Sequence, residues 1–115
     1  MINLEGYRLF VTGAGSGIGL ATVRRASEMG AKLAGTIWGE DQRAALSAFV
    51  ADEHIHDLDV TDSDALDNAI GRTIESFGGL DGALACAGII SLSTSTETTD
   101  DIWESVIGTN LTGSF

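Results

Sequence analysis

Apolar residues along the chain follow two alternating patterns, which predict alternating strands and helices. Short apolar runs predict four strands, at residues 8–12, 32–37, 54–58 and 83–87. Apolar residues at three- and four-residue steps predict four helices, at residues 17–29, 41–50, about 62–77, and from 100 towards 111. A helix between successive strands makes them parallel, because the crossover must cover one face of the sheet. The pattern therefore predicts an α/β fold, a Rossmann-type doubly wound parallel sheet truncated after about four strands and four helices.

Local signals set the ends of these elements and their expected packing. Gly30 and Gly78 follow predicted helices, as glycine commonly does at a helix C-terminus, and polar residues 61–64 can cap the third helix. The fourth strand is almost entirely small and apolar, which is typical of a strand buried on both faces. After a Ser/Thr-rich loop at 91–99, we expect the last helix to pack through Ile102, Trp103, Val106 and Ile107. Ligands of such folds bind at the carboxyl ends of the strands, where the strand order reverses, expected here between the first and fourth strands.

The first predicted strand runs directly into a cluster of glycines that opens the first helix. The spacing is Gly13-x-x-x-Gly17-x-Gly19, whereas G-x-G-x-x-G would require glycine at Ile18 or Leu20. Glycine lets a phosphate approach the backbone, and a helix N-terminus offers unpaired N–H groups and a positive dipole end. The alternative is a glycine-rich turn without a ligand. The position between a strand and a helix favours a pyrophosphate site.

Four segments in this order resemble the short-chain dehydrogenase/reductase family, over essentially the whole chain. The first is the glycine cluster, and the third stands where the family has Asn-Asn-Ala-Gly. The four segments are Thr12-Gly13-x-x-x-Gly17-Ile18-Gly19, Asp59-Val60-Thr61, Ala85-Cys86-Ala87-Gly88, and Asn110-Leu111-Thr112-Gly113 after Trp103. The resemblance implies a nicotinamide dinucleotide as cofactor and hydride transfer as the reaction.

The resemblance also implies roles for individual residues. Asp59 would hydrogen-bond the adenine amino group, and Val60 would pack on the adenine ring. Asn110 is the only catalytic position of the family found here. It would bend its helix by binding a water through the main chain, and so help to seat a proton relay. The pyrophosphate and its flanking ribose would be held by Gly13, Ser16, Gly17, Ile18 and Gly19, with Ala87 and Gly88 under the cofactor ribose.

The family's other catalytic groups are not found in this sequence. In the family a Tyr is the acid/base, a Lys four residues later lowers its pKa, and a Ser steadies the substrate oxygen. Tyr7 and Lys32 are the only tyrosine and lysine, so no Tyr-x-x-x-Lys is present. We therefore predict that residues 1–115 form a single dinucleotide-binding domain, incomplete at its C-terminus and inactive alone. It would supply the cofactor-binding half of an NAD(P)-dependent oxidoreductase acting on a small alcohol or carbonyl substrate. The alternative is a non-catalytic nucleotide-binding or assembly module that truly ends at Phe115.

The end of the second predicted strand bears on the choice between NAD and NADP. A carboxylate there would accept hydrogen bonds from the ribose hydroxyls and select NAD, but Ile37 and Trp38 occupy the position. Arg43, the next basic residue, falls well into the following helix and is not placed to bind a 2′-phosphate. Glu40 and Asp41 are near enough for one of them to reach the ribose. We expect NAD as the cofactor, because the acidic surroundings disfavour a 2′-phosphate.

Composition excludes several other functions. Six basic residues against 17 acidic ones give a formal charge of −11, which argues against binding of nucleic acid or anionic membranes. No apolar run approaches the roughly 20 residues of a membrane span, and the N-terminus lacks a secretory pattern. The lone Cys86, which with Ala85 replaces two asparagines of the family motif, is expected to be a buried small residue and fits a reducing cytoplasm. His54 and His56 share a strand face, but two ligands do not make a metal site, so no metal is predicted.

The sequence also predicts self-association. If the chain stops after the fourth helix, residues 82–87 form an edge strand with unpaired backbone groups and no charged residue to block pairing. The apolar stripe of the last helix would lack part of its cover. We expect a homodimer, because repulsion from the −11 charge is screened beyond about 8 Å at physiological ionic strength.

Overall fold

The sheet is built from four parallel strands in the order β3-β2-β1-β4, as seen in a computed structural model that describes residues 2–115. Phe10 in the middle of β1 pairs with Ala34 of β2 on one side and with Ala83 of β4 on the other. The order reverses between β1 and β4, so the predicted place of the reversal is confirmed. The strands are β1 (Arg8–Thr12), β2 (Lys32–Ile37), β3 (Ile55–Asp57) and β4 (Gly82–Ala85).

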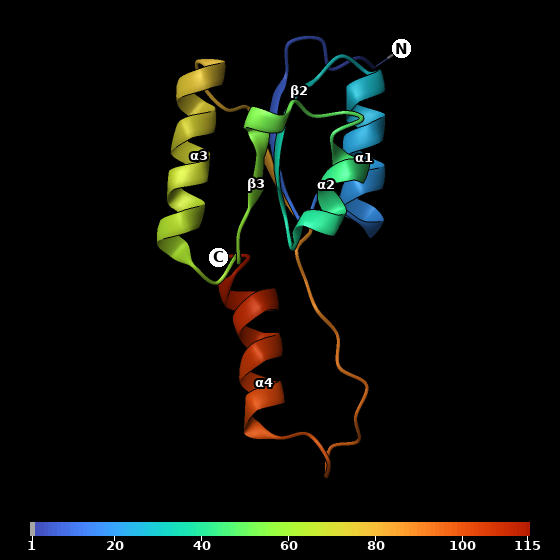
Figure 1. The fold of residues 1–115 in the computed structure, drawn as a ribbon, viewed down its shortest axis with the longest axis vertical. Coiled ribbons are helices and arrows are strands. Elements are labelled where there is room, and N and C mark those ends of the chain that lie inside the picture. Colours follow the sequence, from blue (N-terminus) through green and yellow to red (C-terminus); the bar gives the residue numbers. More distant parts are fainter. Residues whose placement is uncertain (1) are drawn as a thin grey trace.

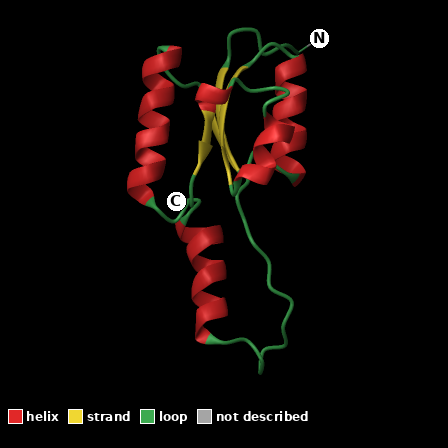
Figure 2. Cartoon of the chain, in the orientation of Figure 1, coloured by secondary structure: helices red, strands yellow, loops and turns green. Residues whose placement is uncertain are grey.

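Helices cover both faces of this sheet. Helices α1 (Gly17–Glu28) and α2 (Arg43–Leu46) lie on one face, and α3 (Ser63–Phe77) lies on the other (Figures 1 and 2). Successive residues of β1 point to opposite faces, so that Val11 belongs to the core under α1 and Phe10 to the core under α3. The predicted doubly wound, Rossmann-type architecture is therefore confirmed.

The predicted signals at the helix ends also act as expected. The Asp62 side chain accepts a hydrogen bond from the Ala65 N–H at 3.1 Å and caps the N-terminus of α3. Gly78 ends the same helix in the left-handed conformation, with φ of +76°. Gly30 follows α1 with φ of +91°. The helical backbone ends where it turns to positive φ, and glycine occupies both positions because a side chain there would strain the backbone.

The predicted helix at 41–50 is wrong in its extent. A 3-10 turn covers Glu40–Gln42, and regular α-helix is limited to Arg43–Leu46. Ala44 and Ala45 are exposed, and Leu46 is the one buried residue of the short helix. The segment therefore buries too little apolar surface to stabilise further turns. The third strand is also shorter than predicted, because His54 belongs to a 3-10 turn at Asp52–His54.

The expectation that β4 is buried on both faces is wrong. Leu84 at its centre is 37% exposed, and Ala83 and Ala85 are exposed as well. One edge of β4 has no partner among the described strands, and α4 (Asp100–Ile107) does not cover the sheet. Figure 1 shows α4 projecting beyond the carboxyl ends of the strands, at the far end of a long connection. The expected packing of Trp103 is also wrong within this chain, because 63% of its side chain is exposed.

An ion pair ties the start of β1 to the turn before β4. The Asp81 carboxylate accepts hydrogen bonds from the Arg8 guanidinium at Nε and Nη2, both at 2.8 Å, and from the Arg8 backbone N–H at 2.9 Å. Arg8 Nη1 also donates to the Gly78 carbonyl at 3.0 Å. The hydrogen bonds from Arg8 lower the pKa of Asp81 to about 2. This two-pronged geometry fixes the amino-terminal ends of β1 and β4 relative to α3.

Replacing Asp81 should reveal this contribution through its pH dependence. A carboxyl whose pKa falls from 3.8 to about 2 on folding stabilises the native state above pH 4, and the contribution is lost as pH falls to 2. We expect Asp81→Asn to lower the urea midpoint at pH 6, with the gap to wild type closing towards pH 2. Asp67→Asn, at an exposed position of α3 with the same charge change, should show no such gap. An equal effect of both variants, or a gap that persists at pH 2, would contradict the assignment.

Candidate functional site

The glycine cluster forms the turn between β1 and α1, at the carboxyl ends of the strands. Gly13 has φ of +62°, and a Cβ there would lie 2.7 Å from the Cα and N atoms of Ala87. A Cβ on Gly19 would collide with the Gly13 carbonyl. Both positions therefore require glycine for close backbone approach. The close approach at Gly13 brings the loop after β1 into contact with the residues that follow β4.

The N-terminus of α1 is open to a ligand. Ser16 stands at the capping position, but no side chain caps the helix. Gly17 has φ of +53°, and a Cβ there would meet no atom within 4 Å. Ser16, Gly17 and Ile18 are all exposed, and the first turn carries no acidic residue. The unpaired N–H groups at the start of α1 thus face open space, which is the arrangement that binds phosphate groups.

Two threonine hydroxyls hold this loop in place. Thr36 Oγ1, buried in β2, accepts the Gly13 N–H at 3.1 Å, and the Thr36 carbonyl accepts the Ala14 N–H at 2.8 Å. Thr12 Oγ1 accepts the Ala87 N–H at 3.3 Å on the other side. Sequence reasoning missed Thr36, whose one signal is a polar side chain within the apolar part of its strand, residues 33–37. The loop is therefore fixed to both neighbouring strands before any ligand arrives.

Asn110 joins the residues after β4 to the end of α4. Its side chain accepts the Ile89 N–H and donates to the Ile89 carbonyl, each at 2.8 Å. This pair places Gly88 directly beside the Asn110 amide. The helix changes to a π-helical turn at Gly108–Thr112, and the Asn110 carbonyl accepts the Ser114 hydroxyl at 2.8 Å. Asn110, Ala87, Gly88 and the glycine loop thus lie along one connected edge.

Asp59 and Val60 follow β3 at the same end of the sheet. One oxygen of Asp59 accepts the N–H of Thr61 at 2.9 Å and its hydroxyl at 2.7 Å, which fixes the carboxylate at the start of the turn. The other oxygen has no hydrogen bond among the described residues. Val60 is 9% exposed, and its side chain contacts Gly113. Little of the Val60 side chain is therefore accessible to an adenine ring, and the part of Val60 left for a ligand is its backbone.

The end of β2 is arranged differently from what the sequence suggests. Ile37 is 1% exposed and turns into the core beneath Gly15. Glu40 pairs with Arg43 at 2.6 Å, and this hydrogen bond lowers the pKa of Glu40. That carboxylate is therefore already bonded, while Asp41 lies against Gly39. Gln42, which sequence reasoning missed, reaches back to the β2 end through a hydrogen bond from the Trp38 N–H at 3.0 Å.

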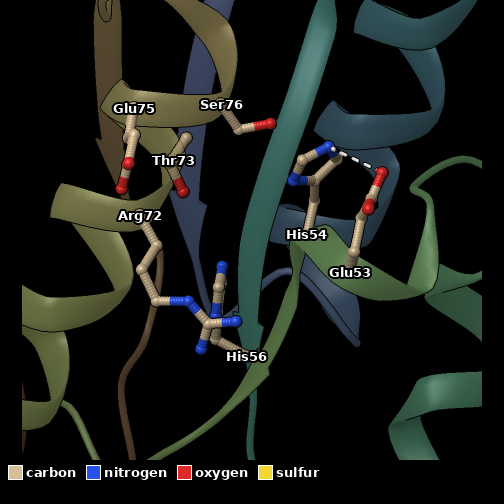
Figure 3. A pocket seen from close by; sticks show the side chains of 7 residues that line it. All are labelled: Glu53, His54, His56, Arg72, Thr73, Glu75 and Ser76. Carbon is tan, nitrogen blue, oxygen red and sulfur yellow. Dashed lines mark ion pairs between the residues drawn. The ribbon is translucent and has the colours of Figure 1, made fainter.

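A hollow of about 290 Å³ lies between β3 and α3, near the amino-terminal end of β3 and away from the glycine loop. Figure 3 shows His56 beside Arg72 there, with His54 next to Glu53. Burial, reinforced by the charge of Arg72, lowers the pKa of His56. The Nε2 atom of His56 is buried without a hydrogen-bond partner in the described structure.

No three His, Cys, Asp or Glu side chains of residues 2–115 are placed to hold a metal ion. Cys86 is half-buried against the core under α1.

No helix within residues 2–115 is both long and apolar enough to cross a bilayer.

The candidate site is a ridge of backbone groups at the carboxyl edge of the parallel sheet. It combines an uncapped helix N-terminus, a carboxylate fixed after β3 and an amide clamp after β4. Such an edge can bind a phosphate-containing ligand at the reversal of the strand order.

Known proteins resemble this chain in sequence and in fold. The chain is 31% identical to an uncharacterized oxidoreductase of Staphylococcus haemolyticus, covering 98% of this chain and 50% of that protein. It is 34% identical to the 3-oxoacyl-[acyl-carrier-protein] reductase of Vibrio harveyi, covering 96% and 46%. A short chain dehydrogenase of Burkholderia cenocepacia, solved in complex with NADP, superimposes with a TM-score of 0.86 at 31% identity, covering 97% and 48%. The chain thus spans about half the length of the relatives it matches. Residues 8–115 match the short chain dehydrogenase family, and the chain belongs to that family.

Proposed function

We propose that residues 1–115 are the dinucleotide-binding half of an NAD(P)-dependent oxidoreductase. The observation that carries this proposal is the open N-terminus of α1, where Gly17 leaves free space in front of unpaired N–H groups. A pyrophosphate placed there would accept hydrogen bonds from the backbone of Ser16, Gly17 and Ile18 and would lie at the positive end of the helix dipole. Gly13 and Gly19 keep the backbone around it compact.

The adenosine would extend from the pyrophosphate along the carboxyl edge of the sheet. The free oxygen of Asp59 would accept the adenine amino group, and the Val60 backbone would border the ring. Ala87 and Gly88 would lie under the ribose on the other side of the strand reversal. Asp59 and Gly88 are each held by hydrogen-bonded neighbours, Thr61 for the first and Asn110 for the second. These contacts support binding by preformed groups rather than by groups that must first be ordered.

A bound nicotinamide would supply hydride transfer to or from a small alcohol or carbonyl substrate. The residues present here bind and orient the cofactor, and Asn110 holds the segment that would lie beneath its ribose. No Tyr-x-x-x-Lys is present to transfer the proton, so the 115 residues alone should not turn over substrate. NAD is the proposed cofactor in preference to NADP.

The proposed location is the cytoplasm, because the lone Cys86 is consistent with a reducing compartment.

Self-association into a homodimer is the second part of the proposal. The free edge of β4 and the exposed apolar side chains of Leu84 and Trp103 support it, because unpaired strand edges and apolar surfaces are buried together on pairing. The non-catalytic assembly module remains the alternative function, and this surface is the observation that favours it.

Filling the space at Gly17 should weaken cofactor binding. A valine there would occupy the position of the phosphate, so we expect Gly17→Val to weaken the affinity for NAD by at least about tenfold in titration calorimetry. Gly78→Val is the matched control, because Gly78 also has positive φ, and a Cβ there would likewise meet no atom within 4 Å. Both variants carry similar backbone strain, and circular dichroism should show both folded. Equal loss of NAD affinity in the two variants would contradict the proposed site.

Charging the exposed surface should dissociate the proposed homodimer. We expect a dimer in light scattering at tens of micromolar and moderate salt, and a shift to monomer in Leu84→Lys if the β4 edge is the contact. A shift in Trp103→Glu alone would assign the contact to α4. Ile74→Lys, at an exposed apolar position of α3, is the control and should leave the dimer intact. A wild-type chain that is monomeric throughout would contradict this part of the proposal.

A further inference from the structure

The glycine loop and the end of β2 are joined by one side chain. Gln42 packs directly against Gly15, so that a Cβ added to Gly15 would lie 2.6 Å from both the Cβ and the Oε1 of Gln42. The same added atom would lie 2.9 Å from the Cγ2 of Ile37, which belongs to the core under α1. Gly15 therefore lacks a side chain because Gln42 and Ile37 already occupy that space. Gln42 consequently stands between the loop that would hold the pyrophosphate and the strand end that would border the ribose.

The amide of Gln42 is fixed through its oxygen. Oε1 accepts the N–H of Trp38 at 3.0 Å, which sets the orientation of the terminal amide. Its Nε2 group, with two N–H donors, has no acceptor within residues 2–115. Gln42 is half-buried, and the hydrogen bond to Oε1 holds its amide in place. The side chain nearest to the glycine loop at this strand end thus offers a neutral donor where a carboxylate acceptor would select NAD.

The charges around this turn are mostly negative. Asp57 accepts the Gly39 N–H at 3.0 Å, and a carboxylate oxygen of Asp41 lies beside Gly39. Arg43 is the nearest cation in sequence to this turn among residues 2–115, and its guanidinium is bonded to Glu40 at 2.6 Å and to Asp52 at 2.8 Å. Its charge is therefore already compensated. A dianionic 2′-phosphate entering this turn would meet carboxylates and no free cation.

We propose that the amide of Gln42 contacts the adenosine ribose, with its Nε2 donating to a ribose hydroxyl oxygen, so that the charge at position 42 sets the preference between NAD and NADP. Asp41 and Asp57 add repulsion against a 2′-phosphate. This inference rests on the proposed dinucleotide site. It places the contact with the adenosine ribose at Gln42, five positions after Ile37. Gln42 also positions the Trp38 turn against Gly15, so its two roles need separate readouts.

Two substitutions at position 42 with opposite charge test the assignment by calorimetry with NAD and NADP. Gln42→Glu keeps an acceptor for the Trp38 N–H and adds a carboxylate, and we expect it to raise the preference for NAD by about tenfold or more. Gln42→Arg should move the ratio of the two dissociation constants towards NADP by a similar factor. Asn68→Arg is the control, because it makes the same change from a neutral amide to a cation at an exposed position of α3, on the opposite face of the sheet. It should change the ratio less than about threefold, since a distant exposed charge is screened.

The outcomes separate this inference from the function on which it rests. Opposite shifts in the two Gln42 variants, with little change in Asn68→Arg, support it, because a purely structural role would weaken the binding of both cofactors alike. An unchanged ratio in the Gln42 variants, or an equal shift in Gln42→Arg and Asn68→Arg, would overturn it while leaving the dinucleotide site intact. Failure of wild type and all variants to bind either cofactor would contradict the proposed function and the inference together.

Discussion

The close approach of the Gly13 backbone to Ala87 is the constraint on which the site depends. A Cβ at residue 13 would lie 2.7 Å from the Ala87 backbone, so only glycine lets the turns after β1 and β4 touch. Hydrogen bonds to Thr12 and Thr36 then hold this contact from both sides. Because α1 begins directly after the turn, its unpaired N–H groups are fixed at the point where the strand order reverses. The location of the site therefore follows from backbone packing and not from charged side chains.

The parts of this arrangement that depend on local pattern could be predicted from the sequence. Apolar periodicity was sufficient for the order of elements, the parallel pairing and the three layers, and the glycine spacing for the loop at the start of α1. Helix caps such as Asp62 and Gly78 are local signals and were found in the same way. These features share one property: each is decided by residues within a few positions of one another.

The parts that depend on distant neighbours could not be predicted. Thr36 supports Gly13 across 23 positions of sequence, and Gln42 fills the space beside Gly15 only because the turn after β2 folds back. The apolar spacing predicted a longer helix than α2, because Ala44 and Ala45 match the helical pattern although both are exposed in the structure. Small apolar residues made β4 look buried, although Leu84 is exposed. The apolar pattern of a strand indicates that the strand is suited to burial. It does not depend on which chain provides the surface that covers it.

Amide chemical shifts recorded during titration with NAD test the central claim most directly, because they report the contact at each backbone N–H. We expect the largest changes from Gly13 to Gly19, with smaller ones near Asp59 and Gly88. The hollow lined by His54, His56 and Arg72 lies near the other end of β3 and should show none. Changes concentrated at that hollow, with the amides at the start of α1 unaffected, would contradict the assignment of the α1 N-terminus as the pyrophosphate site.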